Sequence, residues 1–214
     1  MPSEPSSAAK SEPQPEPQFE PQFEPQFEQA STGRAKCRAC DQRIGKGEWR
    51  VGDVAPNPFT DGTTIYWFHG RCAALRRPEL FVAATEHPTP ESAGAVARWQ
   101  QEFPAAPAWQ RLARSGQAHP RLGRLSRVER SPSGRARCRH CRELIEKGSL
   151  RIVLHLFQEG RFEPRGFLHV RCTSPYVGSP LDSDRLEVLL ETLASDDHAE
   201  FERQLLAPTT PNEA

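Results

Sequence analysis

Apolar residues in this chain gather in short runs that alternate with polar residues, and long helical stretches are few. Four runs are typical of β-strands: residues 49–54, 63–68, 150–157 and 165–168. Asp61-Gly62 lies between the first two runs and Glu159-Gly160 between the last two, and each dipeptide favours a turn. The pattern therefore predicts two small β-rich units with the same layout.

The remaining apolar pattern predicts helices between and after these units. Residues 91–131 begin with helical character, which Pro104 and Pro107 interrupt, and continue as a basic linker. Residues 181–207 are predicted to form amphipathic helices. Packing of these last helices against the second unit is one interpretation, and a dimer seam is the alternative.

The chain begins with a low-complexity segment. The tetrapeptide Glu-Pro-Gln-Phe occurs three times, at residues 16–19, 20–23 and 24–27. Proline at every fourth position removes backbone donors and disfavours both helices and strand pairing. Residues 1–32 are therefore predicted to be a disordered, acidic tail. The regularly spaced phenylalanines are either a docking motif for a partner or part of a biased repeat.

An internal repeat organises the rest of the chain. Residues 33–51 (GRAKCRACDQRIGKGEWRV) and 134–152 (GRARCRHCRELIEKGSLRI) are identical at ten of 19 positions. A repeat of this kind indicates one structural unit used twice. The predicted division is a tail at 1–32, a first unit at 33–90, a linker at 91–131, a second unit at 132–180, helices at 181–207 and a tail at 208–214.

Composition argues against one large hydrophobic core. The 214 residues include 21 prolines and are 36% hydrophobic, and small units of this kind usually depend on a metal or a disulfide. The polar segment 1–10 lacks the apolar run of a secretion signal, and no stretch is long and apolar enough to span a membrane. We therefore expect an intracellular protein, whose clustered cysteines favour metal over disulfides.

The formal charge of zero hides an uneven distribution. Residues 1–30 hold one Lys against six Glu, residues 31–172 hold 25 Lys and Arg against 13 Asp and Glu, and residues 173–214 hold two Arg against nine acidic residues. A basic body between acidic segments suits a polyanionic partner. A solvated, arginine-rich surface is the alternative.

The cysteines carry the clearest chemistry. All six lie in the repeat, and each copy reads Cys-x2-Cys, then 28 or 27 residues, then His-x2-Cys. Zinc takes four such ligands tetrahedrally, whereas disulfides would leave one cysteine of each copy unpaired. A redox Cys-x2-Cys pair would not require the matching His-x2-Cys. The sequence predicts two structural Zn²⁺ ions, held by Cys37, Cys40, His69 and Cys72, and by Cys138, Cys141, His169 and Cys172.

The repeat resembles the zinc fingers of poly(ADP-ribose) polymerase. The shared pattern is Gly-Arg-Ala-x-Cys-x2-Cys, an arginine ten residues after the second cysteine, and the long spacing to His-x2-Cys. The resemblance covers roughly residues 31–76 and 132–174. It implies two PARP-type fingers, each a β-ribbon with a short helix, that recognise DNA strand breaks. It also implies contacts between the DNA backbone and Arg34, Arg50, Arg135 and Arg151.

Fingers of this family also stack apolar side chains on bases that a break exposes. The corresponding loops are residues 57–65 and 157–165. The two stacking positions of the first loop fall on Thr60 and Thr64, which are poor stackers, so their neighbours are the candidates. The resemblance therefore implies base contacts by Phe59, Ile65, Phe157 and Phe162.

Physical chemistry independently supports phosphate contacts by these arginines. An arginine beside a metal-pinned turn loses little entropy when it pairs with phosphate, and its guanidinium matches phosphate oxygens two at a time. A solvated face of the sheet is the alternative environment for Arg50 and Arg151.

The sequence as a whole predicts an α+β protein with two zinc-stapled fingers that binds nicked, gapped or broken DNA. We expect no reaction of its own, because serine elbows, phosphate-cradling loops and open metal sites are not recognisable. The acidic tails would recruit protein partners. The alternatives are a zinc-stapled protein-interaction scaffold, an enzyme and a binder of structured RNA. The expected location is the nucleus in a eukaryote, or the nucleoid in the cytoplasm of a bacterium.

Overall fold

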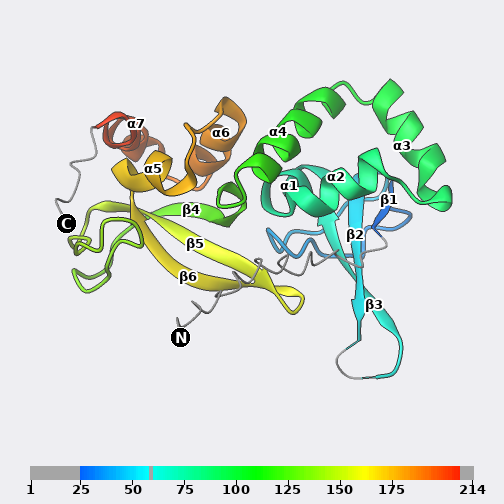
Figure 1. Cartoon of the computed structure of the whole chain (residues 1–214), viewed down its shortest axis with the longest axis horizontal. Coiled ribbons are helices and arrows are strands. Elements are labelled where there is room, and N and C mark those ends of the chain that lie inside the picture. The colour runs from blue at the N-terminus through cyan, green and yellow to red at the C-terminus, as the bar shows by residue number, and fades with distance from the viewer. Residues whose placement is uncertain (1–24, 58–59, 208–214) are drawn as a thin grey trace, which may run out of the picture.

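The structure is a computed structural model that describes residues 25–57 and 60–207. Its elements form two units of similar layout, each a three-stranded antiparallel sheet followed by a short helix (Figure 1). The described residues contain two sheets and seven α-helices, so the predicted α+β class is confirmed. The predicted tail at 208–214 lies outside the described residues.

The sheet of the first unit comprises β1 (Gln26–Gln29), β2 (Trp49–Pro56) and β3 (Thr63–His69), in the order β1-β2-β3. Side chains alternate between the two faces of a sheet. Phe27, Val51 and Phe68 are paired across the strands and face the core. Glu28 and Arg50 therefore lie on the opposite face, which we call the outer face.

Strand β1 corrects the end of the predicted disordered tail at 1–32, because Gln26–Gln29 form an edge strand. Phe27, from the third Glu-Pro-Gln-Phe copy, is 1% exposed, and its ring centroid lies 5.4 Å from that of Trp49 and 5.2 Å from that of Trp99. The proline period leaves Gln26–Gln29 free of proline, and an edge strand needs pairing on one side only. Burying one phenylalanine contributes about 1.5–3 kcal/mol, which favours an ordered strand over a disordered segment. The two earlier copies lie outside the described residues.

Four helices complete the first unit: α1 (Gly70–Arg76), α2 (Pro78–Glu86), α3 (Pro90–Glu102) and α4 (Ala106–Ala118). Proline stands in the first turn of the last three, where a missing N–H leaves no helical hydrogen bond unmade. The side chain of Thr89 caps α3 by accepting a hydrogen bond from the backbone N–H of Ser92 at 3.3 Å. Trp99 of α3 and Phe81 of α2 are fully buried against Phe27.

The second unit repeats the sheet with different helices. Its strands are β4 (Leu125–Arg130), β5 (Leu150–Gln158) and β6 (Arg161–His169). Its helical segments are η2 (Val170–Cys172), α5 (Thr173–Val177), α6 (Ser183–Glu191), η3 (Ser195–Asp197) and α7 (His198–Leu206). Leu189 of α6 and Phe201 of α7 are buried in the core of this unit.

Strand β4 also corrects the predicted linker at 91–131. After η1 (Leu122–Arg124), the chain enters the second sheet, where Val128 pairs with Ile152 and is 2% exposed. A bulge between Leu125 and Arg127 hides the period of two that marks a strand in sequence. The end of the predicted linker is therefore built into the second unit, with Arg124 at the end of η1 and Arg127 and Arg130 on β4.

The two units pack into one body. The hairpin β5–β6 reaches the first unit, where the ring of Phe157 lies 5.5 Å from that of Phe68 and the guanidinium carbon of Arg77 lies 4.1 Å from the centroid of Phe157. Arg185 of α6 donates to backbone carbonyls of α1 and α4, to Leu75 at 3.1 Å and to Leu112 at 3.2 Å. In the described part of the chain, none of the helices combines the length and apolarity that a membrane span needs.

Candidate metal centres and nucleic-acid interface

Each Cys-x2-Cys lies in a tight loop before β2 or β5. In the first copy the backbone N–H of Ile44 donates to the carbonyl of Ala35 at 2.9 Å, and the second copy repeats this bond at 2.8 Å. Asp41 and Arg142, each the residue after the second cysteine, adopt φ values of 59° and 67°. This reversal points both sulfur atoms of the loop toward the end of the following hairpin.

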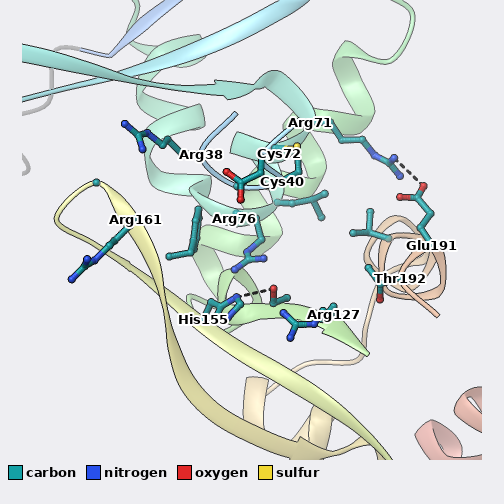
Figure 2. A pocket seen from close by; sticks show the side chains of 17 residues that line it. Arg38, Cys40, Arg71, Cys72, Arg76, Arg127, His155, Arg161, Glu191 and Thr192 are labelled. Carbon is teal, nitrogen blue, oxygen red and sulfur yellow. Dashed lines mark hydrogen bonds and ion pairs between the residues drawn. The ribbon is translucent and has the colours of Figure 1, made fainter. Parts of the chain in front are cut away.

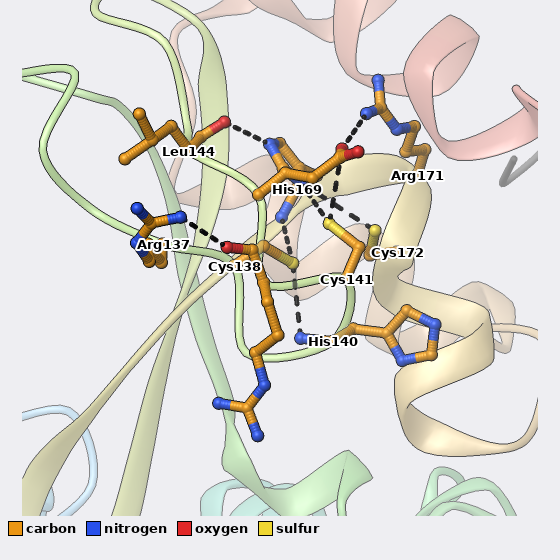
Figure 3. Close-up of polar contacts among 10 residues, drawn as sticks. Arg137, Cys138, His140, Cys141, Leu144, His169, Arg171 and Cys172 are labelled. Carbon is orange, nitrogen blue, oxygen red and sulfur yellow. Dashed lines mark hydrogen bonds and ion pairs between the residues drawn. The ribbon is translucent and has the colours of Figure 1, made fainter. Parts of the chain in front are cut away.

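The structure brings each predicted ligand set together. A strand end supplies the histidine and the next helical turn supplies the last cysteine. Within each set the ligand atoms lie within 4.8 Å of one another: Cys37, Cys40, His69 and Cys72, and Cys138, Cys141, His169 and Cys172. Figure 3 shows the second set, in which Nδ1 of His169 lies 3.3 Å from Cys141 Sγ and 3.9 Å from Cys172 Sγ.

These distances fit tetrahedral zinc. Bonds of about 2.3 Å to sulfur and about 2.0–2.1 Å to nitrogen place neighbouring ligand atoms about 3.5 Å apart. The first set matches as well, with Nδ1 of His69 at 3.4 Å from Cys40 Sγ and 3.8 Å from Cys72 Sγ. Nε2 of His69 lies 3.2 Å from the carbonyl of Arg43, so an N–H there leaves Nδ1 free for a metal. Two structural zinc ions therefore fit the described residues.

The pKa values of the thiols also favour a bound cation. Hydrogen bonding with Cys172 lowers the pKa of Cys138 to about 3, whereas hydrogen bonding with Cys138 and burial raise the pKa of Cys172. In the first set, hydrogen bonds with Cys40 and Cys72 lower the pKa of Cys37, while the pKa of Cys72 is raised. Three thiolates cannot share so small a space unless a divalent charge stabilises them.

Arg50 and Arg151 occupy matching places on the outer faces. Arg50 pairs in register with His69, stacks its guanidinium carbon 3.8 Å from the ring centroid of Trp67, and donates from Nε to Glu28 at 2.9 Å. Arg151 likewise pairs with His169, lies 3.6 Å from the centroid of Phe167, and donates to Glu129 at 2.9 Å. The two guanidinium groups are therefore fixed, with only 8% and 6% of the residues exposed.

The other predicted nucleic-acid contacts lie in different surroundings. Arg34 and Arg135 are exposed, each three residues before the first cysteine of its set. Ile65 is half-buried on the outer face, and a Cβ added at Gly52 would lie 2.8 Å from its Cγ2. Phe59 lies outside the described residues. These positions leave the roles of Arg34, Arg135, Ile65 and Phe59 as predictions.

The structure does not present Phe157 and Phe162 as a free stacking surface. Phe162 lies 6.5 Å from Phe68, under the guanidinium carbon of Arg76 at 4.4 Å, and both phenylalanines pack against the core of the first unit. The hairpin turn carries Gly160, where a Cβ would lie 2.3 Å from the ring of Tyr66, so the two units approach closely here. The implied base contacts of these rings would compete with this packing.

Four residues of the outer faces were missed in the sequence: Glu28, Trp67, Glu129 and Phe167. Their spacing from known motifs in the sequence could have identified them. Each glutamate stands five residues before the glycine of Gly-Arg-Ala, and each aromatic stands two residues before the zinc-binding histidine. Pairing across β1–β2 and β4–β5 brings the glutamates to the arginines, and pairing across β2–β3 and β5–β6 brings the aromatic residues.

Comparison with known proteins finds a family match for part of the chain. Residues 28–94 match the family model of the poly(ADP-ribose) polymerase and DNA-ligase zinc-finger region. Poly(ADP-ribose) polymerase 1 of Danio rerio is 28% identical over 58% of this chain and 12% of its own length. The relative from Oryza sativa is 26% identical over 67% of this chain and 14% of its own length.

A third relative, the poly(ADP-ribose) polymerase of Sarcophaga peregrina, is 25% identical over 82% of this chain. This chain spans less than a fifth of the length of these relatives, from 12% to 19%. The matches support zinc-dependent DNA binding at the level of the family. Residues 28–94 therefore match the PARP-type zinc-finger family model, in a chain with two Cys3His groups that can hold zinc.

Proposed function

We propose that this protein binds DNA through the outer faces of its two sheets and prefers nicks, gaps and ends. One observation carries the proposal: the arrangement of glutamate, arginine and aromatic ring beside the zinc-binding histidine occurs in both units. The second copy shares this arrangement although it lies outside the matched residues 28–94. A repeated geometry of this kind suits a repeated ligand, such as the phosphates along a nucleic-acid backbone.

The guanidinium groups of these arginines are held in place and keep N–H donors for a phosphate. A guanidinium carries five donors, and the carboxylate of Glu28 takes those of Nε and Nη2 of Arg50, so further N–H groups remain for a phosphate oxygen. Stacking on Trp67 holds the guanidinium of Arg50 in place, and strand pairing with the zinc ligand His69 fixes the backbone beneath it. A fixed donor loses less entropy on binding than a free side chain does.

Apolar surface beside the first arginine supports a preference for breaks. Ile65 and Trp67 lie on the same outer face, two residues apart on β3, and both are half-buried. An intact duplex hides its base faces, whereas a nick or an end exposes one against which an apolar side chain can stack. Such stacking is worth about 1–3 kcal/mol per base.

We further propose that the described units act by binding alone. Each predicted metal has four protein ligands, which leaves no open coordination position for a substrate or an activated water. The described residues would then recognise a DNA structure and bring other molecules to it.

A protein-interaction scaffold is the second candidate. It is favoured by the pairing of Arg50 with Glu28 and of Arg151 with Glu129, because these carboxylates already satisfy part of each guanidinium. In a scaffold the pairs would serve only to hold β1 and β4 on their sheets.

Substitution of both arginines separates the two candidates. In the zinc-loaded full chain, Arg50→Gln with Arg151→Gln should weaken duplex binding, measured by fluorescence anisotropy, at least about tenfold per arginine, or about 1.4 kcal/mol each. Arg114→Gln is the matched control, because Arg114 forms an exposed pair with Glu86 away from the outer faces. Zinc content and melting temperature show whether the variants fold. Folded variants with unchanged DNA affinity would favour the scaffold.

A further inference from the structure

A cavity of about 630 Å³ lies between the two units (Figure 2). Its walls come from the first Cys-x2-Cys loop, helix α1, strand β4, the hairpin β5–β6 and helix α6. Cys40 and Cys72 form part of one wall, but the cavity is separate from the outer faces that carry Arg50 and Arg151. Neither the zinc ions nor the proposed duplex contacts account for it.

The cavity is basic. Five arginines line it, Arg38, Arg71, Arg76, Arg127 and Arg161, against two carboxylates, Asp41 and Glu191. Arg71 is paired with Glu191 at 3.3 Å, and Arg127 and Arg161 each pair with a glutamate two residues further along the chain. Among the ion pairs of the described residues, none includes Arg38 or Arg76. The uncompensated positive charge is therefore concentrated on these two side chains.

Arg76 is the central feature of the cavity. Its Nε donates to the carbonyl of Gly123 at 2.9 Å and its guanidinium lies over the ring of Phe162. Its Nη2 is buried and has no hydrogen-bond partner among the described residues. A buried donor without an acceptor is unfavourable, so an acceptor inside the cavity would stabilise this side chain. Figure 2 shows this guanidinium directed toward the side of the cavity that His155 and Arg127 occupy.

His155 and Ser126 supply further polar groups beside Arg76. Nδ1 of His155 lies 2.9 Å from Oγ of Ser126, which leaves Nε2 for another contact. Burial and the positive charges of Arg76 and Arg127 lower the pKa of His155, while Glu129 opposes them. The imidazole therefore experiences a positive field that a bound anion would relieve.

We propose that this cavity binds a terminal phosphate group, a phosphomonoester dianion, through Arg76 and His155, with Arg38 adding positive charge to the cavity wall. A double helix is too wide to reach a donor buried between the two units, whereas a terminal phosphate on a chain end or a small molecule can enter. Its oxygens accept several hydrogen bonds, and guanidinium groups suit them in pairs. Where the phosphate belongs to a broken DNA end, this inference deepens the proposed function and rests on it.

Inorganic phosphate tests the cavity without DNA. Titration of the zinc-loaded full chain, followed by the NMR resonances of His155, should show saturable binding and a raised pKa for that imidazole. Arg76→Gln should weaken binding at least about tenfold, as loss of a charge-assisted bond predicts. Arg38→Gln serves as a second variant, because Arg76 also holds Gly123 and its loss could disturb packing. Arg114→Gln should bind as the parent does. Failure of phosphate to perturb His155 would overturn the proposal.

A nicked DNA hairpin that carries either a 5′-phosphate or a 5′-hydroxyl at the nick shows whether the bound phosphate comes from a DNA end. Tighter binding of the phosphorylated nick, lost in Arg76→Gln, supports a DNA end as the ligand. Equal binding of both nicks, with saturable inorganic phosphate, supports a free phosphate compound in the cavity. Binding of nicks without any response of His155 to phosphate or to DNA leaves the proposed function standing and rejects the cavity.

Discussion

At the scale of single residues, the proposed phosphate contacts depend on how the structure holds Arg50 and Arg151. Each lies opposite a zinc-binding histidine, so the metal and the sheet both fix the backbone beneath it. Each is held between a carboxylate and an aromatic ring. The carboxylate orients the guanidinium, but it also places a negative charge where a phosphate would approach.

Removal of that negative charge should strengthen DNA binding. Glu129→Gln keeps a hydrogen-bond acceptor near Arg151 and removes a charge worth about 1 kcal/mol at this range, so affinity should rise about fivefold. The slope of log affinity against log salt should steepen by about 0.9 if the freed arginine gains a phosphate. Glu86→Gln, at an ion pair away from the outer faces, is the matched control. Weaker binding by Glu129→Gln would mean that orientation outweighs charge.

The pair of Arg151 with Glu129 also predicts a dependence on pH. Burial raises the pKa of Glu129, but hydrogen bonds from Arg151 and Arg127 outweigh it and lower the pKa. A depressed carboxylate pKa stabilises the fold above the pKa of the unfolded chain, and this contribution is lost as pH falls through the folded value. In acid, the parent should therefore lose more of its stability than Glu129→Gln does, as measured by urea unfolding. Parallel losses would contradict the pairing.

At the scale of elements, strand β1 shows how a low-complexity segment can enter a core. The Glu-Pro-Gln-Phe copy at residues 24–27 ends in Phe27, whose ring contacts aromatic residues of β2, α2 and α3. Its backbone N–H donates to Oγ of Ser92 at 3.1 Å. The strand therefore ties the sheet to the helical layer of the first unit.

Truncation of this ring should destabilise the first unit. Phe27→Ala removes a fully buried side chain and should lower the free energy of unfolding by about 3–5 kcal/mol. Chemical denaturation of the zinc-loaded chain measures this loss. Gln26→Ala on the same strand should change the stability by less than about 0.5 kcal/mol, because its side chain is only half-buried. Similar small effects at both positions would show that β1 does not hold the unit together.

The hairpin β5–β6 is the second element to test, because it forms a contact between the two units. Phe162→Ala should loosen the contact between the units, which hydrogen exchange in β3 would report as reduced protection. Phe103→Ala is the matched control, since Phe103 packs on Trp109 in the first unit at 4.7 Å. If Phe162→Ala instead weakens only DNA binding and leaves exchange unchanged, base stacking by this ring regains support.

Some of these elements can be predicted from the sequence and others cannot, for physical reasons. The ligand sets were visible because zinc geometry constrains spacing, and the cysteines and histidines that supply them recur at nearly equal intervals. β1 was missed because proline periodicity resembles disorder, and β4 because its bulge breaks the alternation. The contact of Phe157 with Phe68 was beyond reach, since nothing local in a sequence shows which unit a hairpin will touch.

At the scale of the whole molecule, zinc and packing between the units act together. Each unit has a small core, so its stability should depend on the metal, whose binding free energy in small zinc domains is about 10–16 kcal/mol. The parent should bind two zinc ions per chain in native mass spectrometry, as two complete ligand sets imply. Cys37→Ser and Cys138→Ser should each bind one fewer. Retention of both ions by either variant would contradict the assigned ligands.

The central claim is that the zinc-loaded protein recognises DNA breaks. The most direct measurement compares its affinity for a nicked hairpin with that for the same hairpin sealed, across a series of salt concentrations. We expect the nicked form to bind at least about tenfold more tightly, or by about 1.4 kcal/mol, at each concentration. Equal affinities that fall steeply with salt would show a general phosphate binder, and absence of binding to both would contradict the DNA proposal itself.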